Sequence, residues 1–414
     1  MRLDDEEQAM LAGEFGRVRA WAIRHQVAVG EFFDAADMVA VGQAHIMADG
    51  EAPGEAGVVF LEDLAAAPAA ERKVRIPTIT DPRSVDPAAY RRLGQTERMA
   101  EIHDRLGRAF AALGVLLTDT CINYQTIFPP ARGEHLAMGD TGVAIYANSV
   151  QGALTNFEGG PSALAAGLTG RTPRYGYHLE RHRRGTRHFA VTAPPRNLSD
   201  WAALGGIIGR ATNSYWEVPV VSGIEAVPNS DAMKHFGAAL ASFGSVALFH
   251  MPGITPEAPS LPAAFAGAVP PAQPIARADI DGFYAGYAAP GEKLDIVVFS
   301  APQLSLFEMQ AVADALAGRR INPTTALVVT TSPEIKSAAD RMGLTRIMED
   351  AGAMVLSGVC FYQAYAREIA DANGWSRLMT NSAKLVNILG GYGYKVTLST
   401  FEHCVDSAVA GRIL

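Results

Sequence analysis

The sequence predicts an α/β protein of several domains in which parallel sheets are flanked by helices, and three observations carry this prediction. Short apolar runs at 294–300, 325–331 and 353–360 alternate with stretches of helical length, which is the pattern of a parallel sheet covered on both faces. The chain has 414 residues, 49% of them hydrophobic, so it can bury more than one core. A proline-rich stretch at 252–274 is typical of a long loop between domains.

Three regions are expected along the chain. They are an N-terminal α/β region over 1–190, a middle α/β region over 191–275 that ends in the proline-rich loop, and a C-terminal α/β region over 276–414. Apolar periodicity predicts helices at 1–25, 56–67, 86–114, 160–170, 200–212, 230–244, 306–318 and 335–352. Besides the three apolar runs, strands are predicted at 37–46, 72–80, 115–121, 187–192, 218–224, 245–251 and 394–398.

Glycine and proline set several of these boundaries. Gly114 closes the long helical stretch before 115, and Gly170 stops the short helix that begins near Pro161. No repeat of fixed period interrupts the alternation, and the alanine-rich patches have the composition of helices.

Charge and composition exclude several classes of protein. The formal net charge is −8 and the sequence pI is about 5.7, so a broad nucleic-acid-binding surface is not expected. The acidic start lacks the basic and then apolar order of a secretory leader, and no apolar run reaches the length of a membrane helix. We therefore expect a soluble, cytoplasmic protein that binds neither nucleic acid nor membrane.

Three cysteines stand in contexts that favour a functional site. Cys121 and Cys360 each follow an apolar strand, where ligands of open α/β sheets bind. Cys404 lies near the start of a predicted helix, and a helix N-terminus favours the thiolate. The three thiols could converge on one metal or cluster, but each could also be a small buried hydrophobic residue.

The stretch 157–170 combines paired glycines with a helix start. Gly159 and Gly160 allow a tight turn and a close approach of backbone to a ligand. The free N–H groups of Ser162 and its neighbours would then form an anion site, which Arg171 extends with a fork of donors. The alternative is a helix start that packs under a turn and binds nothing.

Further polar residues near predicted strand ends are candidates for catalysis and binding. Glu134, His135 and Lys384 have side chains that can move or hold a proton, so we expect catalytic roles for them. The candidates for substrate binding, in addition to the helix-start residues, are His45, Asn148, Ser149, Thr380, Asn381 and Ser382. Taken singly, each of these is also an ordinary loop or turn residue.

Together, four segments of the sequence resemble the aconitase X family. The segment from Tyr146 to Leu179 resembles its long central signature, and GEHLAM, MTNSAK and FEHCVDSAVAGR fall where the family has matching segments. The resemblance covers nearly the whole chain. It implies an aconitase-like multi-domain large subunit of an iron–sulfur hydro-lyase, for example one that dehydrates cis-3-hydroxy-L-proline or a phosphorylated mevalonate.

The resemblance also implies a cofactor and a partner. Cys121, Cys360 and Cys404 would hold an iron–sulfur cluster, 2Fe-2S or 4Fe-4S, or a single iron with one open position for substrate. The small swivelling part that carries the proposed serine base in the family is not found in this sequence. A separate small subunit is therefore expected to supply the base, and the expected substrate is a small hydroxy acid.

Departures from the family pattern concentrate near the expected pocket. Asp119 stands where many members have a cysteine, and Leu154 and Phe157 replace two arginines. A lost arginine removes a bidentate contact to a carboxylate or phosphate. Two alternatives therefore remain open: a diverged enzyme of specialised metabolism that works by elimination, isomerisation or cyclisation, and a non-catalytic subunit that kept the fold.

Overall fold

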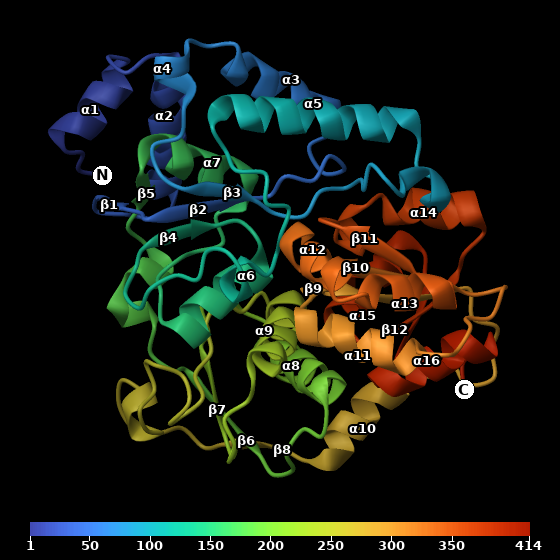
Figure 1. Ribbon diagram of the computed structural model, residues 1–414. Coiled ribbons are helices and arrows are strands. Elements are labelled where there is room, and N and C mark those ends of the chain that lie inside the picture. Colours follow the sequence, from blue (N-terminus) through green and yellow to red (C-terminus); the bar gives the residue numbers. More distant parts are fainter.

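The computed structural model describes residues 1–414, and the expected alternation of helices and strands in an α/β fold is confirmed. The strands form three larger sheets and one two-stranded ribbon, and Figure 1 shows the sheets with helices packed around them. Every strand pairing within the three larger sheets is parallel. No helix combines the length and the apolar character that crossing a membrane requires.

The N-terminal part of the chain builds a small parallel sheet under several helices. Its elements are α1 (Asp5–Ala12), α2 (Arg17–Phe32), β1 (Met38–Ala40), β2 (Gln43–Ile46), α3 (Gly54–Ala65), α4 (Ala69–Arg72), β3 (Thr78–Thr80), η1 (Tyr90–Leu93), α5 (Glu97–Leu113), η2 (Asn123–Gln125), β4 (Leu136–Met138), α6 (Thr141–Tyr146), η3 (Ala147–Gln151), α7 (Gly159–Thr169), β5 (Arg171–Pro173), η4 (Gly176–His178) and η5 (Glu180–His182). The N-terminal sheet has the order β3-β2-β4, and apolar side chains of α2, α3, α5 and α7 pack around Ile46 of its central strand. The sheet thus presents its carboxyl edge toward the rest of the molecule.

Several expected elements of this part differ in the structure; for example, the helix expected over 86–114 begins only at Glu97, as α5. The helix expected over 1–25 is divided into α1 and α2, because Gly13 takes a left-handed conformation with φ 89° that ends α1. The strand expected over 115–121 is wrong, since Leu116 makes only an isolated bridge with Ile79. Cys121 consequently lies in a loop rather than at the end of a strand.

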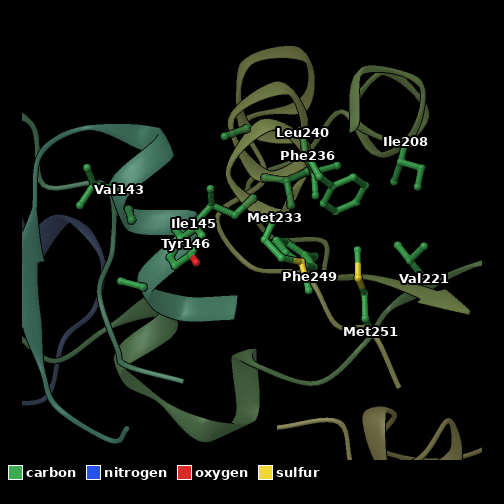
Figure 2. Close-up of a cluster of buried hydrophobic side chains, with 14 of the residues drawn as sticks. Val143, Ile145, Tyr146, Ile208, Val221, Met233, Phe236, Leu240, Phe249 and Met251 are labelled. Atoms are coloured by element: carbon green, nitrogen blue, oxygen red, sulfur yellow. The ribbon is translucent and has the colours of Figure 1, made fainter. Parts of the chain in front are cut away.

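The middle part packs two helices tightly against a second parallel sheet. Its elements are β6 (Arg187–Val191), α8 (Leu198–Thr212), β7 (Pro219–Ser222), α9 (Ser230–Gly244), η6 (Pro262–Ala264) and β8 (Gln273–Ile275). A Cβ atom at Gly205 would lie 2.3 Å from the carbonyl oxygen of Phe236. Glycine at this position therefore lets the backbones of α8 and α9 come into contact. Figure 2 shows Phe236 and Phe249 in the largest apolar cluster, which joins this part to α6. The strand expected over 245–251 is wrong, because the segment forms only one isolated bridge, at His250.

The C-terminal part is a doubly wound sheet with the order β11-β10-β9-β12-β13. Its elements are α10 (Arg277–Ala285), β9 (Ile296–Leu304), α11 (Leu306–Leu316), β10 (Ala326–Thr331), α12 (Pro333–Arg341), α13 (Leu344–Ala351), β11 (Met354–Ser357), η7 (Phe361–Gln363), α14 (Ala366–Asn373), β12 (Arg377–Thr380), α15 (Ala383–Leu389), η8 (Gly390–Tyr392), β13 (Lys395–Leu398) and α16 (Phe401–Ala410). The single helix expected over 335–352 is divided at Gly343, whose φ is 76°. The strand order reverses between β9 and β12, and ligands of such sheets bind beside this point.

The two faces of the C-terminal sheet carry separate apolar cores. Val297 and Phe299 of β9 belong to the core with α11, α13 and α16. Ile296 and Val298 belong to the core with α14 and α15. Successive side chains of a strand point to opposite faces of the sheet. A residue that packs with Val297 and Phe299 therefore lies on one face, and a residue that packs with Ile296 and Val298 lies on the other.

Candidate active site

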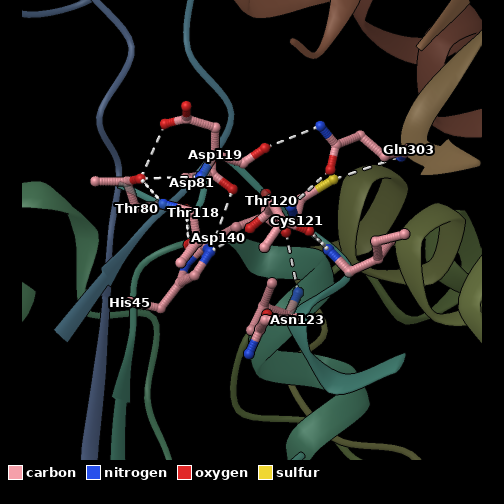
Figure 3. Close-up of polar contacts among 12 residues, drawn as sticks. His45, Thr80, Asp81, Thr118, Asp119, Thr120, Cys121, Asn123, Asp140 and Gln303 are labelled. Atoms are coloured by element: carbon pink, nitrogen blue, oxygen red, sulfur yellow. Dashed lines mark hydrogen bonds and ion pairs between the residues drawn. The ribbon is translucent and has the colours of Figure 1, made fainter. Parts of the chain in front are cut away.

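Buried polar residues gather where the N-terminal sheet meets the C-terminal sheet. His45 is on β2, and Asp81 follows β3 directly. Figure 3 shows these two side chains together with Cys121, Asp140 and Gln303. The group combines residues from chain segments that lie far apart in the sequence, as expected when carboxyl ends of parallel strands meet.

His45 and Asp81 form a fully buried pair. The Nε2 atom of His45 lies 2.8 Å from the carbonyl oxygen of Thr120 and 3.5 Å from Oδ1 of Asp81. The other carboxylate oxygen of Asp81 accepts a hydrogen bond of 2.8 Å from Gln363, whereas Oδ1 and the Nδ1 atom of His45 have no hydrogen-bond partner. Burial, and then the nearby Asp140, raises the pKa of Asp81 well above its ordinary value, which favours the protonated carboxyl.

Lys384 and Asp140 form a buried ion pair between the two sheets. Their Nζ and Oδ1 atoms are 3.3 Å apart, and the side chains are only 6% and 5% exposed. Burial alone would lower the pKa of Lys384, but Asp140 and the two nearby thiols together raise it, so the ammonium stays charged. Burial would likewise raise the pKa of Asp140, and Lys384 reverses that effect. Asp140 also caps α6 by accepting a hydrogen bond from the N–H of Val143.

Cys121 and Cys360 lie next to each other in this group. The Cys360 side chain, followed by burial, raises the pKa of Cys121 well above its ordinary value. Each sulfur also accepts a hydrogen bond, at 3.5 Å from the N–H of Gln303 and at 3.8 Å from the hydroxyl of Ser300. Both thiols are therefore held in place by β9, the central strand of the C-terminal sheet.

Gln303 is a residue that the sequence analysis missed. Its Oε1 atom accepts from the N–H of Cys121 at 3.2 Å. Its Nε2 atom donates to the carbonyl oxygens of Asp119, Thr331 and Val359 at 3.1 to 3.3 Å. The side chain thereby ties the loop before Cys121 to the loop before Cys360. The only sequence signal was a polar residue three positions after the apolar run at 294–300.

The structure does not bring Cys404 to the other two cysteines. Cys404 lies on α16, in the core that contains Val297 and Phe299. Cys360 belongs to the core on the opposite face, with Ile296 and Val298. The expectation of one three-cysteine centre is corrected accordingly, because the sheet itself separates the thiols. Burial raises the pKa of Cys404, as expected for a thiol in an apolar core.

The donor set at the site does not fit a cluster held by three cysteines. Two thiols are present there, and no group of three or more His, Cys, Asp or Glu side chains is arranged to hold a metal ion. The nearest cation is the ammonium of Lys384, which interacts with both thiols.

Several residues expected to bind substrate make hydrogen bonds or ion pairs within the fold, and their role in binding stays a prediction. Asn148 donates to the carbonyl oxygens of Thr155 and Ala247, both at 2.9 Å. Ser149 accepts a hydrogen bond of 2.9 Å from the N–H of Phe249. Arg171 pairs with acidic residues of α1, among them Glu7 at 3.1 Å. These three side chains face structural partners rather than the group around Lys384.

The glycine-rich helix start and the Glu134–His135 pair form a second polar region. Gly159 has a left-handed φ of 58°, and Ser162 lies 2.9 Å from Nε2 of His25. Glu134 accepts a hydrogen bond of 2.9 Å from the N–H of Ala131, so it caps its own loop. A Cβ atom at Gly160 would meet only ordinary contacts, at 3.7 Å or more.

His135 contacts a second histidine in this region. Its Nδ1 atom lies 2.9 Å from Nδ1 of His178. Burial, and then His178, lowers the pKa of His135 to about 4, so the ring is neutral at neutral pH. His178 in turn lies 3.8 Å from the buried Glu158. The pair is therefore linked to a carboxylate rather than to the thiols.

The residues after β12 lie at the reversal point of the C-terminal sheet. The Ser382 hydroxyl donates to the carbonyl oxygen of Ala301 at 2.6 Å, and its N–H donates to the Thr380 hydroxyl at 3.1 Å. Asn381 lines a cavity of about 260 Å³ together with Phe299. These contacts fix the start of α15 and hence the position of Lys384.

Comparison with known proteins gives a consistent result over the whole chain. Family models match as aconitase X first domain over residues 1–181, second domain over 185–285 and third domain over 294–410. The phosphomevalonate dehydratase large subunit of Methanothermobacter thermautotrophicus is 36% identical, over 94% of each chain. The cis-3-hydroxy-L-proline dehydratase of Pseudomonas aeruginosa is 32% identical, over 99% of this chain and 70% of that one. The crystal structure of the holo-form of Thermococcus kodakaraensis aconitase X matches with a TM-score of 0.88 at 28% identity, over 99% and 100% of the two chains.

Proposed function

Because this chain belongs to the aconitase X family, we propose that it is the large subunit of a hydro-lyase that removes water from a small hydroxy acid. The observation that carries the proposal is the buried Lys384–Asp140 ion pair beside Asp81, a buried carboxyl whose pKa is raised well above its ordinary value. Perturbed ionisable groups that converge at a sheet edge are typical of catalytic sites.

Elimination of water needs an acid, a base and a group that binds the departing oxygen. The C–H electron pair becomes the new double bond, and the C–O pair leaves with the oxygen, which takes one proton to become water. Asp81 supplies that proton, since its raised pKa favours the protonated form and its Oδ1 atom has no hydrogen-bond partner. Lys384 holds the oxygen by donating a hydrogen bond to it.

The base that removes the C–H proton comes from a small partner subunit in this proposal. The names of the relatives support it, because the archaeal proteins are called large subunits. His45 and Asp140 orient Asp81 and Lys384, respectively, and so fix the two groups that act on the departing oxygen. After one turnover the proton taken by the base and the proton lost by Asp81 are exchanged through solvent.

The aconitase X resemblance also implies an iron–sulfur cluster, which in such enzymes supplies a Lewis acid for the departing hydroxyl. Cys121 and Cys360 are the residues here that could contribute thiolates to it. Cys404 cannot join them across the sheet, so the expected three-cysteine ligand set is incomplete.

The leading substrate class is a hydroxy acid without a phosphate, such as cis-3-hydroxy-L-proline. One ammonium, Lys384, serves the buried centre, and it is already paired with Asp140. A phosphate carries more charge than one paired ammonium balances. The second candidate is a phosphorylated mevalonate, which the 36% identity to the Methanothermobacter phosphomevalonate dehydratase subunit favours, against 32% to the Pseudomonas cis-3-hydroxy-L-proline dehydratase.

The proposal is tested by assaying this chain together with a small subunit of an aconitase X complex. Each candidate substrate is incubated with the pair, and loss of substrate and gain of the dehydrated product are followed by mass spectrometry. Turnover of cis-3-hydroxy-L-proline that disappears in Asp81→Asn supports the proposal, and turnover of phosphomevalonate alone selects the second candidate. Absence of dehydration with every small hydroxy acid tried would refute it.

A further inference from the structure

Lys384 is a buried cation with unused hydrogen-bonding capacity. Its ammonium carries three N–H donors, and the structure gives it one hydrogen-bond acceptor, Oδ1 of Asp140 at 3.3 Å. The ring of Tyr362, whose centroid is 5.3 Å from Nζ of Lys384, makes a cation–π contact with the ammonium. This contact supplies no lone-pair acceptor for the remaining N–H groups. A buried ammonium is costly unless its donors are satisfied, so the remaining donors are available to a ligand.

The groups around this ammonium leave no other source of positive charge in the centre. The Nε2 atom of His45 lies 2.8 Å from the carbonyl oxygen of Thr120, and burial lowers the pKa of this ring, which favours its neutral form. Two further cations lie beside the centre, and both are paired with carboxylates. Arg83 contacts the carbonyl oxygen of Ser357 at 3.0 Å and Asp119 at 3.5 Å. Lys234 donates to the carbonyl oxygen of Gln303 at 3.2 Å and pairs with Glu308 and Asp231. A negatively polarised substrate atom that enters the centre therefore meets Lys384.

The sulfur ligands of the centre are limited to two. The chain contains three cysteines, and Cys404 lies on the far face of the C-terminal sheet from Cys360. Three thiolates are the set that would hold a cluster and leave one iron open, so this centre falls one thiolate short. An ammonium next to the two remaining thiols also opposes the approach of a second cation.

We infer that the centre of this chain is built on a fixed ammonium: Lys384 binds a carboxylate or hydroxyl oxygen of the substrate directly, and Cys121 and Cys360 retain no iron cluster. This inference rests on the proposed function, since it names the group that takes the place of a Lewis acid at the departing oxygen. It makes Lys384 a catalytic residue and Asp140 a positioning residue.

The first test measures iron and needs no turnover. The full chain is purified without oxygen, supplied with iron and sulfide, passed through a chelating column and analysed for both elements and for visible absorbance. We expect the wild type to retain no more iron or sulfide than a Cys121→Ala/Cys360→Ala variant. Iron retained by the wild type in at least one atom per chain, and lost in that variant, would overturn the inference even if dehydration is confirmed.

The second test measures binding of glycolate, the smallest hydroxy acid, by its effect on the unfolding temperature of the full chain. We expect a saturable rise for the wild type, loss of that rise in Lys384→Met, and a weaker rise in Lys384→Arg, which keeps a positive charge. Lys395→Met removes an exposed lysine and serves as the control.

Two outcomes of this second test are decisive. An equal rise in Lys384→Met and in the control contradicts the assignment of Lys384 as the cation of the site. A wild type that glycolate does not stabilise at all contradicts it as well. Because neither test requires dehydration, failure of the inference is distinguishable from failure of the proposed function.

Discussion

The two faces of the C-terminal sheet each hold one buried cysteine in very different surroundings. Cys360 follows β11 at the carboxyl edge, where the Ser300 hydroxyl donates to its sulfur and Cys121 lies beside it. Cys404 lies along α16 among apolar side chains such as Val405 and Met379. A cysteine near a helix start or a strand end is thus functional only if it is also on the face and edge where polar groups from other segments converge. Variants at Lys384, Gln303 and Cys404 test this contrast, and a variant at Glu51 probes a buried carboxyl outside it.

The largest effect is expected for Lys384→Met. This change leaves the Asp140 carboxylate buried without its partner, which costs about 3–5 kcal/mol of unfolding free energy and abolishes dehydration. The measurement is urea unfolding together with the activity assay. A Lys384→Met/Asp140→Asn double variant is the control, since Asn still caps α6, and it should recover most of the stability but none of the activity. Equal stability of the single and double variants would contradict the buried ion pair.

A smaller loss is expected for Gln303→Leu, which keeps the volume of the side chain but removes its hydrogen bonds. The N–H of Cys121 loses its acceptor and the carbonyl oxygen of Val359 loses a donor, which costs about 1–3 kcal/mol. Activity should fall further than stability explains, because the two thiol loops are no longer tied together. Gln303→Glu is the matched comparison, since it retains the acceptor for Cys121 and loses the donors. A Gln303→Leu variant with normal activity would show that the tie does not position the centre.

Replacement of Cys404 should have only a small structural effect. Cys404→Ala leaves a gap of one sulfur atom in an apolar core, which costs about 1 kcal/mol, and activity per folded molecule should not change. Cys404→Ser buries a hydroxyl among apolar atoms and should be less stable than the alanine variant. The comparison with Cys360→Ala, measured in the same assay, shows whether the two faces differ as the structure indicates. Equal loss of activity in Cys404→Ala and Cys360→Ala would break the contrast.

The smallest effect is expected for the pH dependence of the unfolding temperature, and it involves Glu51, which contacts neither Cys360 nor Cys404. Glu51 accepts a hydrogen bond of 2.7 Å from the N–H of Tyr365, and burial raises its pKa to about 7. The unfolded carboxyl has a lower pKa, so the folded state binds the extra proton and loses stability as pH rises from about 4.5 to 7. Glu51→Gln should therefore unfold at a higher temperature than the wild type at pH 8, with no gain at pH 4.5.

The control for this last prediction is Glu14→Gln, at an exposed position. It should shift the unfolding temperature by the same small amount at both pH values. A Glu51→Gln variant that behaves like this control would show that Glu51 titrates as an ordinary surface carboxyl.

Much of the fold was predictable from local pattern alone. The apolar runs at 294–300 and 325–331 became β9 and β10, because buried parallel strands need apolar side chains on both faces. The strands expected at 115–121 and 245–251 did not form. An apolar run shows that a segment is buried, but a strand also needs a neighbouring strand whose backbone N–H and C=O groups are free to pair with it. Each of these two segments makes only an isolated bridge.

The candidate site was only partly predictable. The rule that ligands bind at carboxyl ends found Cys360, Lys384 and His45, since a strand end is visible in the sequence. The same rule applies to Asp81, which directly follows the strand expected over 72–80, but this residue was not among the candidates. The rule could not find Gln303, because the contacts of its side chain with Cys121 and Val359 join segments that are far apart in the sequence. The family resemblance supplied the fold and the class of reaction, but it did not tell on which face of the sheet Cys404 lies.

The Lys384–Asp140 ion pair also constrains how sequences of this family can diverge. The two residues lie 244 positions apart, yet loss of either one alone leaves a buried charge unpaired. A lineage that drifts at position 384 must therefore change position 140 at nearly the same time, or pass through a poorly folded ancestor. Among descendants of a common gene the two positions should be inherited as a unit, so that an isolated change at one of them marks a chain that has lost its catalytic role.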